Sequence, residues 1–151
     1  MWILRLDMTD RSYRLEDLPA AYQHLGGRGL TSTIVSDEVP PICHALGPNN
    51  KLVFAPGIVT GTAAPTSARV SAGAKSPLTR GIKEANAGSS WAPELAKMDI
   101  KALVVEGQPK EKGKFWLVHL AWDAAAGKPQ VQFFPADEYV GQDLYEVFPK
   151  V

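Results

Sequence analysis

A glycine-rich segment with one arginine, Gly26-Gly27-Arg28-Gly29, is the first place where the sequence suggests ligand binding. Glycines let backbone amides approach a ligand closely, and a helix N-terminus just after them, together with the arginine, favours a phosphate or similar anion. The same residues also suit a helix C-cap and a tight turn, with Arg28 in solvent. The segment alone does not decide between these two interpretations.

A long stretch of small side chains, residues 60–71, includes a second arginine, Arg69. Small residues let the main chain lie flat against a planar ligand, and hydroxyl and amide groups hydrogen-bond the edge of a heterocycle. Arg69 adds a permanently charged donor fork. This chemistry suits a pterin. The alternative is a mobile surface loop, because segments so poor in bulky side chains are often disordered.

A third candidate segment, residues 75–88, contains Lys75, Arg80 and Asn86. The amide oxygen of Asn86 is a ligand that Mg²⁺ accepts, and the two cationic side chains suit phosphates. An asparagine followed by Ala-Gly is also typical of a turn. Composition alone favours the turn.

Cys43 is the only cysteine, so the chain contains neither an intrachain disulfide nor a self-contained cysteine-ligated zinc or iron–sulfur site. The three histidines, His24, His44 and His119, lack metal-site spacing, and we interpret them as structural or surface residues. Cys43 has no candidate base at a recognised spacing and is interpreted as a small buried hydrophobe. We predict no catalytic residue within the chain.

The composition indicates one domain of ordinary size, with 45% apolar residues among 151. Lys plus Arg and Asp plus Glu number 16 each, so no net charge attracts nucleic acid or an anionic membrane. No apolar run approaches the roughly 20 residues that span a bilayer, and the N-terminus does not read as a secretion signal. We therefore expect a cytoplasmic protein without nucleic-acid or membrane partners.

Hydrophobic spacing and turn residues predict an α+β fold that is mostly sheet. An N-terminal hairpin is expected from residues 2–6 and 11–15, followed by helices over 16–25 and 30–38. A further helix is expected after Ser89-Ser90, where the serines suit a cap and Pro93 a first turn. The remaining predicted strands are 52–55, 70–74, 100–106, 115–121 and 131–134, with short helical turns at 136–140 and 143–148.

The order of the motifs along the chain resembles the N-terminal domain of the tungsten-containing aldehyde:ferredoxin oxidoreductase family. The resemblance covers nearly the whole chain and is far more specific than any single glycine-rich loop. The motifs are Ile3-Leu4-Arg5-Leu6-Asp7-Met8-Thr9, Leu25-Gly26-Gly27-Arg28-Gly29-Leu30, Asp37-Glu38-Val39, Leu46-Gly47-Pro48-Asn49-Asn50-Lys51-Leu52-Val53-Phe54-Ala55, Gly57, Thr60-Gly61-Thr62, Ala64-Pro65, Ser67, Arg69, Lys75-Ser76-Pro77-Leu78-Thr79, Glu84-Ala85-Asn86, Gly88, Pro93-Glu94-Leu95 and Val104-Val105-Glu106-Gly107.

The resemblance implies a largely β, mixed-sheet base domain with a few short helices, on which a tungsten or molybdenum bis-pterin cofactor with Mg²⁺ lies. Arg69 matches the arginine between the pterin and the 4Fe-4S cluster, and Asn86 matches the asparagine that helps to hold the Mg²⁺. With Gly26, Gly27, Arg28, Gly29 and Lys75, these two residues are the predicted cofactor contacts, and Asn86 is the predicted metal contact.

Two local departures from the family pattern stand out, and the chain is also short. Ser89-Ser90 replace a usual Gly-Gly, and Asp99 replaces a usual glycine. Residues 1–151 are expected to form a single, truncated N-terminal domain, ending before the parts that supply the cluster cysteines, the main pterin-binding motifs and the acid/base groups.

We therefore expect one portion of an oxidoreductase that converts aldehydes to carboxylic acids with ferredoxin as acceptor, inactive by itself. Its partner would be the cluster-bearing remainder or a separately encoded large subunit, with ferredoxin for the full enzyme, and exposed apolar surface also suits a homodimer. The alternative is a non-catalytic pterin-binding or subunit-interaction module with the same fold. A generic nucleotide-phosphate binder is disfavoured because the sequence has no G-x-x-x-x-G-K-[ST] motif.

Overall fold

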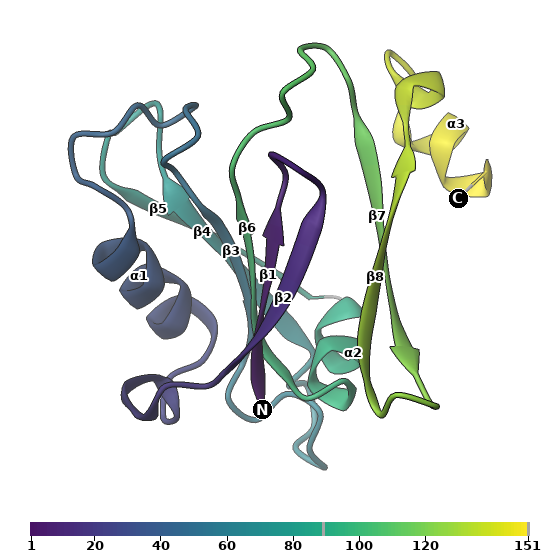
Figure 1. Ribbon diagram of the computed structural model, residues 1–151. Helices are drawn as coiled ribbons and strands as arrows, with labels where there is room; N and C mark the ends of the chain where they lie inside the picture. The colour runs from purple at the N-terminus through teal and green to yellow at the C-terminus, as the bar shows by residue number, and fades with distance from the viewer. Residues whose placement is uncertain (89, 151) are drawn as a thin grey trace. The chain divides into compact units, whose positions relative to one another are not determined.

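The computed structural model describes residues 1–88 and 90–150. The chain forms two compact units, Met1–Gln108 and Pro109–Val151, and each is described by itself. Figure 1 shows the course of the chain.

The first unit is built on a six-stranded mixed sheet with the strand order β2-β1-β6-β3-β4-β5. Neighbouring strands are antiparallel except for β1 and β6, which are parallel. The sheet and its few short helices confirm the predicted α+β class. The strands are β1 (Trp2–Asp7), β2 (Ser12–Asp17), β3 (Leu52–Pro56), β4 (Arg69–Lys75), β5 (Ile82–Gly88) and β6 (Ile100–Glu106).

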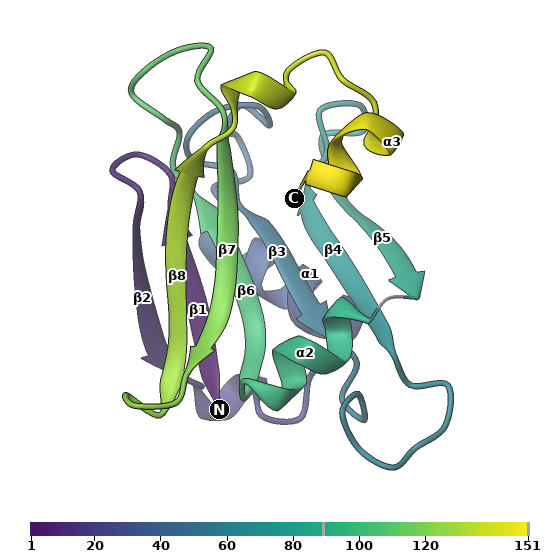
Figure 2. The same cartoon turned by 90° about the vertical axis from the view of Figure 1, so that its right-hand side faces the viewer.

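Helix α1 (Gly27–Glu38) covers one face of this sheet and the shorter α2 (Trp91–Lys97) covers the other, as Figure 2 shows. Leu30 and Ile34 of α1 are fully buried and share one apolar cluster with Ile3 and Val53 of the sheet. On the opposite face, the rings of Phe54 and Trp91 meet edge to face with centroids 5.1 Å apart. Burial of these apolar faces holds both helices on the sheet.

Close packing at Gly73 holds α1 against β4. A Cβ atom at Gly73 would lie 2.7 Å from Oγ1 of Thr31, so only glycine lets the helix approach this closely. The N-terminal half of α1 therefore lies directly over β4 and next to β5, which brings residues 26–29 close to two strands that are distant in sequence.

The prediction of a helix over residues 16–25 is wrong. Glu16 and Asp17 continue β2, whose pairing with β1 extends to the Trp2–Asp17 position, and only Ala20–Tyr22 form a single 3₁₀ turn after Pro19. The apolar spacing was real, since Tyr22 is buried, but backbone pairing with β1 outweighed the helical preference of the segment. Tyr22 donates its hydroxyl to Asp37 of α1 at 3.0 Å.

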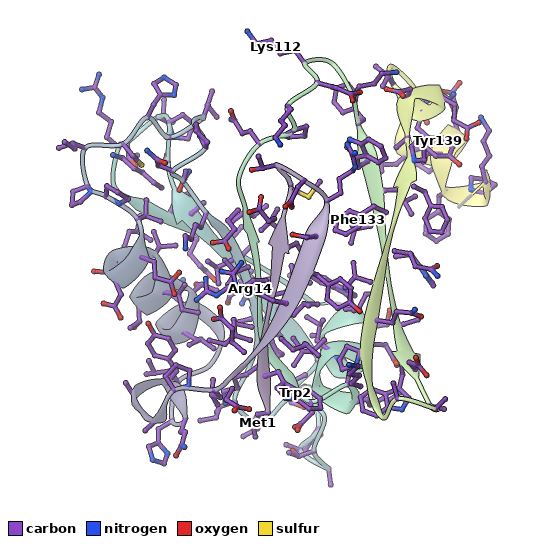
Figure 3. All side chains as sticks on the ribbon, in the orientation of Figure 1. Met1, Trp2, Arg14, Lys112, Phe133 and Tyr139 are labelled. Carbon is purple, nitrogen blue, oxygen red and sulfur yellow. The ribbon has the colours of Figure 1, made fainter. Side chains whose placement is uncertain are left out.

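A charged network that the sequence did not reveal ties α1 to the sheet. Arg5 donates two hydrogen bonds to Glu38, at 2.7 and 2.6 Å, and a third to Glu16 at 2.6 Å. Lys51 bonds Glu38 at 2.6 Å and Glu106 at 2.8 Å. Arg14, labelled in Figure 3, joins from β2 through Glu16 and Glu106. Three cations and three carboxylates thus neutralise one another, so the network is structural.

The second unit contains an antiparallel hairpin, β7 (Trp116–Asp123) and β8 (Lys128–Pro135), as predicted. A 3₁₀ turn (Asp137–Tyr139), helix α3 (Leu144–Val147) and a last 3₁₀ turn (Phe148–Lys150) follow. The Asp143 side chain accepts hydrogen bonds from amides in the first turn of α3, and the Glu146 side chain accepts one from the Asp143 N–H, which completes a capping box. Across the described residues of both units, no helix is long and apolar enough to cross a membrane.

Candidate functional site

The predicted glycine-rich segment forms the beginning of α1. The helix starts at Gly27, earlier than expected, and Gly26 is its N-cap, with no side chain to bond the first amides. The N–H groups of a first helical turn have no acceptor within the helix and point outward. A Cβ atom at Gly26 would lie 2.6 Å from the backbone nitrogen of Ile58, and Gly27 has a φ of +51°, so glycine is required at both positions.

Strands β4 and β5 present their polar side chains beside this helix N-terminus. Ser71 of β4 lies directly opposite Asn86 of β5, and a Cβ atom at Gly27 would lie 3.4 Å from Oγ of Ser71. Nδ2 of Asn86 donates to Oγ of Ser71 at 2.9 Å, and Nε of Arg69 donates to Oδ1 of Asn86. The structure therefore places the glycine-rich segment, Arg69 and Asn86 next to one another, although 60 residues separate them along the chain.

Asn86 lies inside β5, so the turn considered for this residue is wrong, and β5 itself was not expected. The surface-loop alternative for residues 60–71 also fails in part, because residues 69–71 belong to β4. The preceding segment is held by hydrogen bonds from Oγ1 of Thr60 to the Ser67 carbonyl and from the Gly57 amide to the Arg69 carbonyl. Paired strands give Arg69 and Asn86 fixed positions that a loop or a turn would not provide.

Glu84 is the member of this cluster that sequence reasoning missed. Its side chain is only 10% exposed, and Nη2 of Arg28 lies 3.2 Å from its Oε2. The neighbouring Ser71 hydroxyl and the charge of Arg28 hold the pKa of this carboxyl below its ordinary value, although burial opposes them. The signal was present in the sequence, because Glu84 and Asn86 alternate as residues on one face of a strand do. Arg28 and Arg69 carry two positive charges and Glu84 carries one negative charge, so the cluster has a net charge of +1.

Lys75 lies apart from the cluster. It is six residues beyond Arg69 on the same strand, roughly 20 Å away at about 3.3 Å per residue. Its ammonium is buried and donates to the backbone carbonyls of Pro41 and Cys43, so it secures the loop that follows α1. The structure does not bring Lys75 to the other predicted contacts, and its role at a cofactor stays a prediction.

Several donors of the cluster have no protein acceptor. Within residues 1–88 and 90–150, the two terminal nitrogens of Arg69 have no hydrogen-bond or ion-pair partner, and the Arg69 and Asn86 side chains are exposed. The same described residues contain no group of three or more His, Cys, Asp or Glu that could hold a metal ion by itself. The predicted metal contact at Asn86 therefore stays a prediction, and any ion there would need further ligands.

The fold and this cluster define a class: a mixed-sheet domain with a platform of arginine, amide and helix-terminal N–H donors along one sheet edge. The chain belongs to the aldehyde ferredoxin oxidoreductase family, because the model of that family's N-terminal domain matches residues 3–151.

Two longer proteins that are similar in sequence are named as enzymes of this family. The tungsten-containing aldehyde ferredoxin oxidoreductase of Thermococcus kodakarensis is 38% identical over 110 residues, which cover 72% of this chain and 18% of that protein. The enzyme of the same name from Pyrococcus furiosus is 37% identical over 110 residues, with the same coverage. The chain thus spans about a fifth of the length of these relatives, 18% in both cases.

A solved structure matches along almost the whole chain. The active site complex BamBC of benzoyl coenzyme A reductase, in complex with 1,5-dienoyl-CoA, superimposes with a TM-score of 0.83 at 27% identity. The match covers 99% of this chain and 22% of the other. The sheet architecture described above is therefore shared with a related enzyme.

Proposed function

We propose that residues 1–151 form the N-terminal domain, and one wall of the tungsten or molybdenum bis-pterin site, of an oxidoreductase that oxidises aldehydes to carboxylic acids with ferredoxin as acceptor. The observation that carries the proposal is the meeting of Arg69, Asn86 and the α1 N-terminus on one edge of the sheet. Family membership and the names of the relatives support the same assignment.

The donor set of the cluster fits such a cofactor. Gly26 and Gly27 carry no side chains that would shield the first amides of α1, so a phosphate or a planar ring edge can approach them. Arg69 would present its terminal nitrogens to anionic oxygens, while its bond to Asn86 holds the guanidinium in place. Asn86, held by Arg69 and Ser71, would direct its amide oxygen toward a Mg²⁺ that phosphates also bind.

The cofactor would supply the redox chemistry when bound, and the protein would supply binding, orientation and charge. Arg28 and Glu84 also belong to this surface. Their ion pair would hold the Arg28 side chain against β5, and the Glu84 carboxylate would limit the net positive charge of the cluster to one. Nothing in these roles requires an acid, base or nucleophile from this chain, which agrees with the proposal that the chain alone is inactive.

Exposed apolar side chains support a large protein partner. Ile42 is 97% exposed, Leu78 is 91% exposed and Leu46 is 67% exposed, and all three lie in the loops around Lys75. Such side chains gathered in one region suit burial against another protein surface. The occupant proposed here is the cluster-bearing remainder of the enzyme, in the same chain or as a separately encoded large subunit.

The test is to purify the chain with and without that cluster-bearing part and to measure bound tungsten, molybdenum and pterin together with aldehyde-dependent dye reduction. We expect metal, pterin and activity only in the complex. Aldehyde-dependent activity of the chain alone would overturn this division of roles. A complex that retains pterin but reduces no dye with any aldehyde would favour the non-catalytic pterin-binding module instead.

Arg69→Gln tests the site within that complex. We expect it to lower the pterin and metal content at unchanged complex yield, because it removes the free guanidinium donors at the cluster. Arg11→Gln is the matched control, since Arg11 is an exposed arginine in the turn between β1 and β2, away from both the cluster and the loops around Lys75. Equal pterin content in both variants would contradict the placement of the cofactor on this edge.

A further inference from the structure

Lys101 occupies an irregular position in the sheet. In the parallel pairing of β1 with β6, Trp2 lies opposite Ile100 and Ile3 lies opposite Ala102, so Lys101 is an extra residue between two paired ones. Bulges of this kind interrupt the ladder and redirect the side chain of the extra residue, and they occur often next to binding sites. The side chain of Lys101 is therefore placed by a local departure from regular pairing.

Lys101 is also a largely buried residue whose amine keeps contact with solvent and has no partner among the described residues. The residue is 8% exposed, and among residues 1–88 and 90–150 no carboxylate, carbonyl or hydroxyl forms a hydrogen bond or ion pair with Nζ. The other buried cations of the first unit are satisfied, because Arg5 bonds two glutamates and Lys75 bonds two carbonyls. Buried lysines are almost always paired, so an unpaired one requires an explanation.

Lys101 lines a small, open cavity. Its volume is about 170 Å³, and it is lined by Lys101, Asp99, Met1 and the segment around Gly57, Thr60 and Thr62. This segment packs closely against α2: a Cβ atom at Gly61, which has a φ of +84°, would lie 2.6 Å from Cβ of Ala96. Figure 3 labels Met1 at the start of β1, where its amino group pairs with Asp99 at 2.8 Å. Asp99, the carboxylate on the wall, is thus already paired with another cation.

We propose that this cavity binds small aldehydes covalently through Lys101. Nζ attacks the carbonyl carbon, the C–N bond forms, and the carbonyl oxygen leaves with two protons as water, so that an imine remains. The step is reversible and needs neither an oxidant nor a reductant. Loss of hydration on burial lowers the pKa of Lys101, which raises the fraction of neutral, nucleophilic amine.

Reductive trapping on the intact 151-residue chain tests this proposal. The chain is incubated with propanal and sodium cyanoborohydride at mildly alkaline pH, and each lysine is quantified by peptide mass spectrometry. We expect the N-propyl product at Lys101 to form about tenfold faster than at Lys97, as for a desolvated amine in a pocket. Lys97 is the internal reference because its side chain is 67% exposed and pairs with Glu94.

Two controls separate the cavity from general amine reactivity. Replacing propanal with oxidised dextran, a polymeric aldehyde, should remove the preference for Lys101, because the polymer cannot enter a cavity of about 170 Å³. Lys101→Met should lose only the product at position 101, and the wild-type competition remains decisive if this variant does not fold. Labelling of Lys101 no faster than Lys97, equal preference with the bulky aldehyde, or labelling confined to the Met1 amino group would each overturn the proposal.

The inference goes beyond the proposed function and needs neither the pterin cofactor nor the remainder of the enzyme. The trapping experiment reads covalent chemistry at one lysine, whereas the test of the proposed function reads metal, pterin and dye reduction in a complex. A negative result in the trapping experiment would therefore not affect the proposed function, and a negative result for the proposed function would not affect the aldehyde-binding proposal.

Discussion

Neutralising Glu38 tests whether the charged network that ties α1 to the sheet stabilises the first unit. Burial alone would raise the pKa of Glu38, but hydrogen bonds from Arg5 and Lys51 lower it to about 2 from an ordinary value of 4.5. At roughly 1.4 kcal/mol for each pKa unit, this difference corresponds to about 3.5 kcal/mol. The Glu38 side chain is 20% exposed, so solvent screening reduces the estimate to about 2 to 3 kcal/mol.

We expect Glu38→Gln to lower the free energy of unfolding at pH 7 by about 2 to 3 kcal/mol, since it leaves Arg5 and Lys51 with fewer counter-charges. The assay is urea unfolding followed by circular dichroism and by tryptophan fluorescence in a background with Trp116 and Trp122 replaced by Phe, so that Trp2 and Trp91 report on the first unit. Glu94→Gln is the matched control. Glu94 forms an exposed pair with Lys97 at 2.7 Å, and exposed pairs contribute at most about 1 kcal/mol.

The pH dependence provides a second readout with a defined sign. The pKa of Glu38 is lower in the folded state, so the unfolded chain binds more protons in the window from about 4.5 down to about 2. The wild-type chain should lose this stabilisation as the pH falls through that window, and Glu38→Gln should lose correspondingly less. A cost no larger than that of Glu94→Gln, or an unchanged acid profile in Glu38→Gln, would refute the reasoning.

Three further changes test backbone and hydrogen-bond arguments. Gly26→Ala should lower the free energy of unfolding, measured in urea, by about 1 to 3 kcal/mol, because the new methyl group would clash with the Ile58 backbone. Gly29→Ala is its control: the new methyl group would meet nothing closer than 3.9 Å, so the change should be neutral or stabilising by up to about 1 kcal/mol. Tyr22→Phe should cost about 1 kcal/mol at pH 7. Burial and the Asp37 carboxylate raise the pKa of Tyr22 from 10.0 to about 12, so an absorbance titration should show one late tyrosine, and its stabilisation should be lost above pH 10. Lys75→Met should cost about 1 to 3 kcal/mol by leaving two carbonyls without their donor, whereas a Lys83→Met control should be near neutral.

The buried strands could be predicted because their apolar runs are visible in the sequence. Residues 52–55 and 100–106 are examples, and both became central strands of the sheet. Strand β5 was missed because an edge strand needs few apolar residues, and its segment Ile82–Gly88 carries mostly small and charged ones. The helix expected over residues 16–25 failed for the converse reason, since long-range pairing with β1 cannot be read from local spacing.

The candidate site was predicted only in part. Motif order indicated Arg69, Asn86 and the glycine-rich segment, but which of them touch depends on the register of β4 with β5. Glu84 escaped notice because strand β5, which places it beside Asn86, was not predicted, and Lys101 escaped notice because the burial of a charged side chain is a tertiary property. Lys75 was predicted as a cofactor contact from its place in a motif. In the structure its ammonium instead bonds two backbone carbonyls far from the cluster, which a motif does not reveal.

Glycine packing explains why the cluster forms on this edge of the sheet. Gly73 lets α1 lie close to β4, and Gly26 lets the chain pass Ile58 on its way into the helix. These two contacts, one on each side of the first turn, fix the height and the direction of the helix N-terminus over Ser71. The arginine and amide groups of β4 and β5 are then held in place by the strand register, independently of any ligand. The platform is therefore preorganised, and a ligand that binds there loses little free energy in ordering the protein.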